Sequence, residues 1–140
     1  MACGVSKALG GEGLTNEIIE AVVNMLRGLK LYAAVTLGPL PAGNGVSVAP
    51  DSGCVETDFF DRSMVKSLPL VFNAKHEKPE RALAALDAIH RALTRAKAYP
   101  EAAGWQILTI QTESAPGYLG QEDNRRTLYG SSVTVRYLER

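Results

Sequence analysis

The stretch "SLPLVFNAKHEKPERALAALDAIHRAL" (residues 67–93) holds a strand followed at once by a helix, and this pair fixes the fold class. Apolar side chains recur at every second position, which predicts a strand over 62–75. Pro69 has no N–H for a β-ladder, so we expect either a bulge there or a strand at the edge of a sheet. Pro79 fits the first position of the helix, which should end before Pro100.

The predicted helix after Pro79 has two different faces. One is an apolar stripe formed by Leu83, Leu86, Ile89, His90, Leu93 and Lys97. The other carries small and basic side chains: Arg81, Ala84, Ala88, Arg91, Ala92 and Arg95. This second face has two interpretations, the high helix propensity of alanine and arginine or close approach to a neighbouring subunit.

A first helix is predicted over residues 15–29. Thr15 suits the N-cap, and Leu14 and Ile19 suit a hydrophobic staple around it. Helical spacing links the apolar residues Ile18, Ile19, Val22, Val23, Leu26 and Leu29. Residues 1–13 are rich in glycine and lack periodicity, so we expect a flexible leader.

Shorter patterns predict the remaining strands. Residues 31–38 and 46–50 read as strands joined by a hairpin turn at "LPAGNG", and 51–61 read as irregular. Residues 105–113 are rich in β-branched side chains. The last predicted strand, 127–138, alternates cleanly, with one face formed by Tyr129, Ser131, Val133, Val135 and Tyr137.

The predicted order of elements is therefore α-β-β-β-α-β-β. Strands joined by short turns favour a largely antiparallel sheet, and two amphipathic helices need an apolar surface to cover. We predict an α+β fold, a two-layer sandwich of about five strands with both helices on one face. At 140 residues the chain suits one domain, which we place at 14–140.

The stretch "APGYLGQEDNRRTLYG" (residues 115–130) separates the last two predicted strands. Its proline, glycines and charges are typical of a loop, and we expect one over 115–128. Most hairpin loops have two to five residues. A loop of this length is interpreted as a contact surface or, alternatively, as a mobile hairpin tip.

Composition excludes some function classes. Lysine plus arginine and aspartate plus glutamate both number 15, so no basic excess favours nucleic acid as a partner. No apolar run is long enough for a signal peptide or a membrane span, and we expect a cytoplasmic protein with no membrane partner. Two cysteines, Cys3 and Cys54, make no disulfide framework and favour free thiols.

No motif indicates catalysis, a metal or a cofactor. His90 lies on the apolar stripe without an acidic residue four positions away, which favours a core histidine bonded to a carbonyl over a general base. His76 reads as solvated, and two cysteines with two histidines at scattered positions match no zinc pattern. The acidic residues of 51–61 match no calcium loop. We therefore predict neither an enzyme nor a metal site.

Read from end to end, residues 14–139 resemble the tail terminator family, minor capsid proteins of long-tailed phages. The resemblance rests on "NEIIEAVVNMLRGL", on the strand with a proline in its middle and the "ALxALDxIHxxL" helix, and on "GWQILTIQTESAPGYLGQEDNRRTLYGSSVTVRYLE". The leader and the "NRR" segment have no counterpart in the family's pattern.

This resemblance implies a virion structural protein, assembled in the host cytoplasm. Such a subunit forms a ring, usually hexameric, that caps the tail tube and supports head–tail joining. Its implied partners are other copies of itself, the tail tube protein and a head-completion protein. On this view the 115–128 segment reaches a neighbour, and Tyr118, Leu119, Arg125 and Arg126 are the expected anchors, since tyrosine and arginine are enriched at energetic centres of interfaces.

Two alternatives stay open from sequence. One is a head-completion or connector protein, which would not arrest tube growth. The other is a small cytoplasmic α+β enzyme or ligand-binding domain with a pocket between helices and sheet. Polar groups that converge on His90 would favour the second alternative.

Overall fold

The computed structural model describes residues 11–51, 54–58, 64–122 and 125–140. In this part of the chain two helices and seven strands follow one another in the order α1 (Gly11–Met25), β1 (Val35–Leu37), β2 (Gly45–Pro50), β3 (Cys54–Asp58), β4 (Met64–His76), α2 (Pro79–Thr94), β5 (Glu101–Ala102), β6 (Trp105–Gln121) and β7 (Thr127–Glu139).

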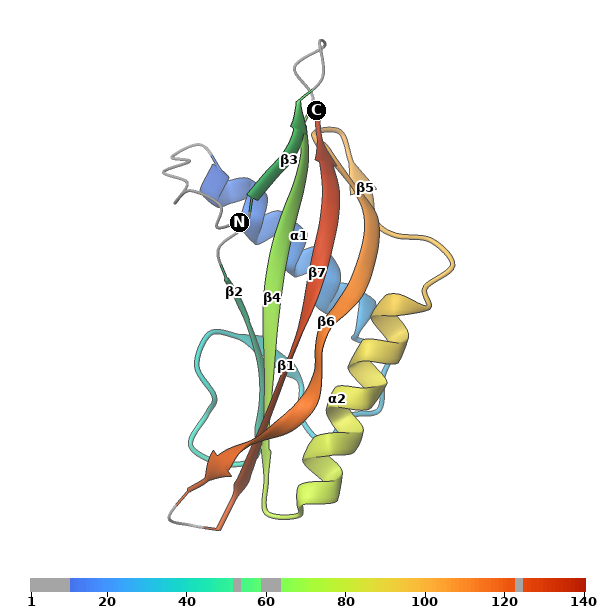
Figure 1. Ribbon diagram of the computed structural model, residues 1–140. Helices are drawn as coiled ribbons and strands as arrows, with labels where there is room; N and C mark the ends of the chain where they lie inside the picture. Colours follow the sequence, from blue (N-terminus) through green and yellow to red (C-terminus); the bar gives the residue numbers. More distant parts are fainter. Residues whose placement is uncertain (1–10, 52–53, 59–63, 123–124) are drawn as a thin grey trace.

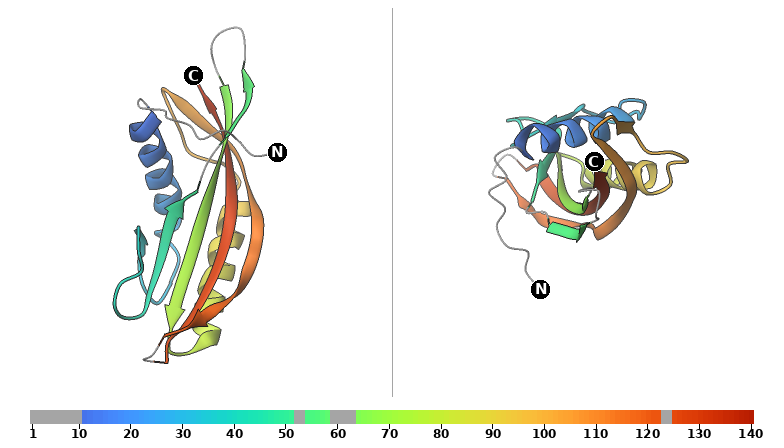
Figure 2. Two further views of the ribbon diagram at one scale, coloured as in Figure 1. Left: turned by 60° about the vertical axis from the view of Figure 1, so that its left-hand side comes forward. Right: turned by 90° about the horizontal axis from the view of Figure 1, so that it is seen from above.

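The strands form one sheet in the order β1-β2-β4-β7-β6-β5, with β3 also paired to β4 (Figure 1). The sheet is strongly curled, and both helices lie on its inner side (Figure 2). All pairs but β1–β2 are antiparallel. The predicted α+β class is confirmed, with two layers, a largely antiparallel sheet and both helices on one face. Short strands β3 and β5 raise the predicted count.

Strand β4 lies at the centre of this sheet, which corrects one prediction. It pairs with β7 over its whole length without a register shift, so Pro69 lies neither at a bulge nor in an edge strand. On the other side of β4, β3 pairs up to Ser67 and β2 pairs from Leu70. The carbonyl of Pro69 accepts a hydrogen bond of 2.8 Å from the N–H of Asp51, in the segment between β2 and β3. The missing N–H of Pro69 therefore falls where the ladder is already interrupted.

The core lies between the helices and the inner face of the sheet. Leu70 and Phe72 of β4 are fully buried, as are Val133 and Val135 of β7, which confirms the predicted alternation of both strands. The stripe of α2 differs from the prediction at both ends, because Leu83 is exposed while Ala82 and Ala85 are buried, and because the helix ends at Thr94, before the exposed Lys97. The remaining buried residues of α2 are Leu86, Ile89, His90 and Leu93.

Helix α1 begins before its predicted N-terminus. It starts at Gly11, so Thr15 lies inside the helix and the predicted cap and staple are wrong. It ends at Met25, after which Leu26, Arg27 and Leu29 donate backbone hydrogen bonds to carbonyls three residues back. The tighter turn explains the predicted end at residue 29, since these bonds continue a helical spacing. Residues 1–10 of the predicted leader lie outside the described residues.

The predicted hairpin between residues 31–38 and 46–50 is wrong. Strand β1 covers only Val35–Leu37 and runs parallel to β2, with Val35 opposite Val46. The chain leaves β1 at Gly38, whose φ of 106° is a conformation that glycine adopts without strain. The loop that follows returns to the start of β2 at Gly45, so β2 runs in the same direction as β1. The turn chemistry of "LPAGNG" is real, but it closes a wide loop and not a tight hairpin.

The segment 51–61, predicted to be irregular, contains strand β3, which pairs with the first part of β4. Its acidic residues are therefore distributed over a strand and the adjoining chain, and Asp61 lies outside the described residues. A strand of five residues is too short to show a clear apolar periodicity in the sequence. Its conformation is set by pairing with β4 and not by its own residue pattern.

Candidate interaction surface

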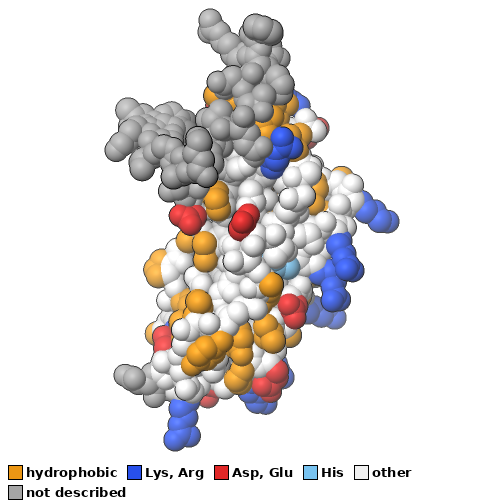
Figure 3. Space-filling model, in the orientation of Figure 1, with side chains coloured by type: hydrophobic (Ala, Val, Ile, Leu, Met, Phe, Trp, Pro, Cys, Tyr) orange, Lys and Arg blue, Asp and Glu red, His pale blue; other side chains and the backbone are white. Residues whose placement is uncertain are grey.

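The long hairpin of β6 and β7 carries the most exposed large apolar side chains of the described chain. Tyr118 and Leu119 are 64% and 61% exposed, and nearly all residues from Gln111 to Gln121 are exposed as well. In Figure 3 hydrophobic side chains gather on the surface over this end of β6. Large exposed apolar patches mark interaction sites more often than isolated apolar residues do.

The predicted loop over 115–128 is wrong, because most of it is strand. β6 continues to Gln121 and β7 starts at Thr127, so only residues 122–126 separate the two strands. Its glycines and Pro116 lie within β6. A strand at the edge of a sheet tolerates such residues, since one side of its backbone has no ladder to complete.

Strand β6 bends because it is longer than its partner. It has 17 residues against 13 in β7, and the surplus is taken up at four register shifts, all with the extra residue on β6. The last shift lies between Tyr118 and Gly120, so Leu119 is the bulged residue. Bulges bend a strand and redirect its side chains.

Tyr118 and Leu119 point to opposite faces of the hairpin. The ring of Tyr118 packs edge-on against that of Tyr129, with centroids 6.0 Å apart. Leu119 covers Gly130, the next residue of β7: a Cβ at Gly130 would lie 2.6 Å from Leu119 Cδ1. Adjacent residues of a strand face opposite sides, so the hairpin presents an apolar side chain on each face.

A buried lysine anchors the turn of this hairpin. The side chain of Lys75, at the end of β4, is 4% exposed, and its Nζ donates to the carbonyl of Pro41 at 2.6 Å and to Glu122 Oε2 at 3.1 Å. Its backbone N–H donates to the hydroxyl of Tyr32 at 3.1 Å. Burial raises the pKa of Tyr32 to about 12. Lys75 thus joins the hairpin turn, the loop after β1 and the chain before β1.

The two arginines of the turn differ in their surroundings. Arg126 is half-buried, and its Nε donates to Asn44 Oδ1 at 2.9 Å, which adds a second link to the loop after β1. Arg125 is exposed and has a φ of 70°, a left-handed conformation. Arg125 N–H donates to Glu122 O, and Glu122 N–H donates to Arg126 O, so the turn is closed by its own backbone.

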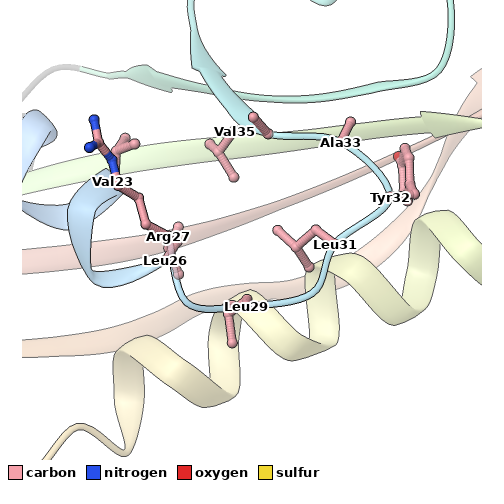
Figure 4. A pocket seen from close by; sticks show the side chains of 9 residues that line it. Val23, Leu26, Arg27, Leu29, Leu31, Tyr32, Ala33 and Val35 are labelled. Atoms are coloured by element: carbon pink, nitrogen blue, oxygen red, sulfur yellow. The ribbon is translucent and has the colours of Figure 1, made fainter.

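A cavity of about 620 Å³ opens on the helix side, between the end of α1 and the chain that returns to β1 (Figure 4). Its lining is apolar except for Arg27 and comprises Val23, Leu26, Leu29, Leu31, Tyr32, Ala33, Ala34 and Val35. A second cavity of about 280 Å³ lies on the other side of Leu31 and Tyr32, where Lys30 and Arg81 line it together with alanines of α2.

His90 is held by a hydroxyl and not by a carbonyl as predicted. It is 7% exposed, and its Nδ1 lies 2.8 Å from Thr112 Oγ1 on β6. Burial lowers its pKa, and Asp87 opposes this shift only in part. Thr112 is the single side chain of the described chain with a hydrogen bond to the ring, so polar groups do not converge on it.

Among the described residues no group of three histidine, cysteine, aspartate or glutamate side chains could hold a metal ion. No helix of the described chain is long and apolar enough to cross a membrane. Cys3 lies outside the described residues, and Cys54 lies in β3.

Of the four predicted anchors, Tyr118 and Leu119 lie together on β6, and Arg125 and Arg126 lie in the adjoining turn. Two features of this end of the molecule, the buried Lys75 and the cavity, were not predicted from the sequence. Lys75 lies in the strand pattern on the face opposite Leu70 and Phe72, where a lysine is expected to be solvated, so the local pattern gave no signal of its burial. The cavity has no signal in sequence, because separate segments line it.

We predict that Lys75 and Glu122 act as one unit. Glu122→Gln should lower the free energy of unfolding by roughly 1–3 kcal/mol, because it leaves the buried ammonium with neutral acceptors only. The carboxylate is 38% exposed, so water limits the loss. In a Lys75→Met background the same change should have almost no effect. Urea unfolding of the four chains measures this coupling, and additive effects would contradict it.

Stability should also fall in mild acid because of His90. Its pKa is lower in the folded than in the unfolded protein, so the stabilisation is complete above about pH 6.5 and is lost as pH falls below that value. One such group changes the unfolding free energy by at most about 1.4 kcal/mol per pH unit. His90→Gln should flatten the profile between pH 7 and 5. An unchanged slope would show that the ring is not held neutral.

His76→Gln is the parallel measurement, because burial and Arg81 lower the pKa of His76 and act in the same direction. Each variant should remove its own part of the slope.

Comparison with known proteins identifies a shared fold but no family. No protein-family model matches the chain, and no curated protein matches it. Among solved structures, a chain from the "Virion of native gene transfer agent (GTA) particle" superposes with a TM-score of 0.68 at 21% sequence identity. The match covers 95% of this chain and 99% of that chain. The two chains therefore share their fold over nearly their whole length.

Proposed function

We propose that this chain is a structural subunit of a phage-like virion, and specifically a tail terminator-like subunit that forms a ring, caps the tail tube and supports head–tail joining. The observation that carries the proposal is the match with a chain of a gene transfer agent virion, which covers 95% of one chain and 99% of the other. A shared fold alone does not define function, so the surface has to support it.

The surface favours assembly. Its two most exposed large apolar side chains, Tyr118 and Leu119, lie on a hairpin that is fixed at its turn by Lys75 and by the Arg126–Asn44 hydrogen bond. A fixed apolar projection can bind a partner without a large loss of conformational entropy. A net charge of zero adds no long-range repulsion between copies.

The alternatives are distinguished by their partners. A head-completion or connector protein has the same need for a rigid projecting hairpin, but it binds on the portal side of the joint. A small enzyme or ligand-binding domain needs convergent polar groups, and the described contacts of His90 provide one hydroxyl. The proposed subunit acts without a cofactor, and its partners are its own copies, the tube protein and a head-completion protein.

The direct test is electron microscopy of the cognate tail tube protein, polymerised with and without this chain. We expect tubes of defined length that carry a ring at one end, because a bound ring blocks addition of further tube subunits. Tubes of the same length with and without this chain would refute the terminator function. Binding to the head-completion protein without an effect on tubes would favour the connector function.

The turn arginines give a second test in the same assay. Arg125→Glu with Arg126→Glu should abolish ring formation while the monomer stays folded, as judged by circular dichroism and urea unfolding. The matched control is Lys78→Glu with Lys97→Glu, two exposed cations that flank α2, which makes the same change in charge. Equal assembly of both double variants would exclude the turn as a contact.

Asn44→Ala separates two roles of Arg126. It removes the acceptor of Arg126 Nε without a change in charge. Loss of assembly in this variant indicates that Arg126 positions the turn, and normal assembly indicates a direct contact.

A further inference from the structure

We propose that successive copies of this chain join head to tail, with the Tyr118–Leu119 wedge of one copy in the cavity between α1 and β1 of the next. We use "wedge" for these two side chains and the β6 backbone between them. The inference rests on the proposed self-assembly and adds which two surfaces meet.

The shape of the wedge calls for a concave receptor. Tyr118 and Leu119 are both more than half exposed and lie on opposite faces of the hairpin, one beside Tyr129 and the other over Gly130. A flat partner surface could cover only one of the two. A receptor that surrounds the end of the hairpin buries both, and buried apolar area is the main favourable contribution to association.

The cavity between α1 and β1 has the chemistry and the size to receive them. Eight apolar or aromatic residues line it, and its volume of about 620 Å³ lies in the range of about 300–1,000 Å³ that holds drug-sized molecules. Leu31 and Val35 belong to the lining, and Arg27 lies at one side (Figure 4). An arginine beside an aromatic ring is a favourable cation–π partner, which suits Tyr118.

Charge favours a second copy as the occupant. The cavity between α1 and β1 is lined by one cation, Arg27, and by no carboxylate, whereas Lys30 and Arg81 line the neighbouring cavity. Strand β6 contains one charged residue, the exposed Glu113, and no cation. Arg27 of the cavity and Glu113 of β6 are therefore opposite in sign, and such a pair favours one orientation of the contact.

The contact should depend on side chains and not on strand pairing. Beyond Gln106 the outer edge of β6 has no strand partner within the described residues, but it carries Pro116 and the bulges at 112–120. Proline and bulges on an edge hinder the addition of a further strand. Side chains are then the groups through which this end of the hairpin can bind.

The geometry makes the contact heterologous. The wedge is held against β7 of its own subunit, through Tyr129 and Gly130, so it cannot fill the cavity of its own subunit. Each copy has one wedge and one cavity, and contacts of this kind close into a ring when the rotation between copies divides a full turn. An interface of standard size buries about 800 Å² per partner, which is more than two side chains can supply. The wedge would therefore be the centre of the interface, and the exposed part of β6 would form the area around it.

Cysteine cross-linking tests the contact. In a Cys3→Ser, Cys54→Ser background, one chain carries Leu119→Cys and a tag, and the other carries Ala33→Cys. Mild oxidation of the mixture, with and without tube protein, should give a covalent dimer of one tagged and one untagged chain. A chain with both cysteines should give a ladder that ends at the ring. The matched control replaces Leu119→Cys by Leu83→Cys, an exposed leucine of α2, and should give no dimer.

Self-association is measured in parallel by mass photometry. Leu119→Ser should weaken self-association by about 10–100-fold, because the contact loses the burial of one leucine side chain. Leu83→Ser should leave self-association unchanged. Cross-links between two Leu119→Cys chains would show a symmetric hairpin contact and overturn the proposal. Cross-links to the tube protein alone would also overturn it.

The two proposals fail in different ways. A ring that arrests tubes but gives no 33–119 cross-link refutes the wedge contact and leaves the terminator function. A chain that stays monomeric with and without tube protein refutes the wedge contact, and tubes of unchanged length then refute the terminator function.

Discussion

The unbroken pairing of β4 with β7 is the interaction on which the rest of the structure depends. Thirteen residues of each strand are opposite one another, from Met64↔Glu139 to His76↔Thr127. Because the register never shifts, the inner faces of both strands stay in phase and bury one continuous apolar surface under the two helices. Pro69 is compatible with this pairing because its missing N–H faces the point where the chain passes from β2 to β3.

This rigid pair also places the candidate interaction surface. β7 pairs with β4 without a register shift, so the surplus of β6 over β7 is absorbed by bulges in β6 alone. The two apolar side chains of the wedge lie on opposite faces of this hairpin, one beside Tyr129 and the other over Gly130. At the same end, Lys75 of β4 binds Glu122 and Pro41, so the strand that carries the core also fixes the hairpin turn. Core and surface therefore share one scaffold.

The spacing of apolar residues in the sequence predicted the features of the fold that depend on burial. The stripes of both helices, the alternation of β4 and β7 and the α+β class follow from apolar spacing, since the side chains that repeat are those that pack. The loop prediction failed where strand pairing outweighs local residue preferences. Pro116 and the glycines after it are residues typical of a loop, yet pairing with the backbone of β7 holds this segment in a strand. Tyr118 and Leu119 could be found as candidates from residue type alone. Lys75 and the cavity depend on contacts between distant segments, and no local pattern shows them.

An exposed tyrosine and leucine on a chain of zero net charge would favour unspecific aggregation if the hairpin edge could pair with other strands. The bulges and Pro116 oppose that pairing, and they are found in the same segment as the wedge. The segment thus combines an apolar side-chain surface with a backbone that resists strand addition. That combination suits a contact that must be specific in geometry and finite in number, because side chains in a cavity define one neighbour, whereas an open strand edge accepts many.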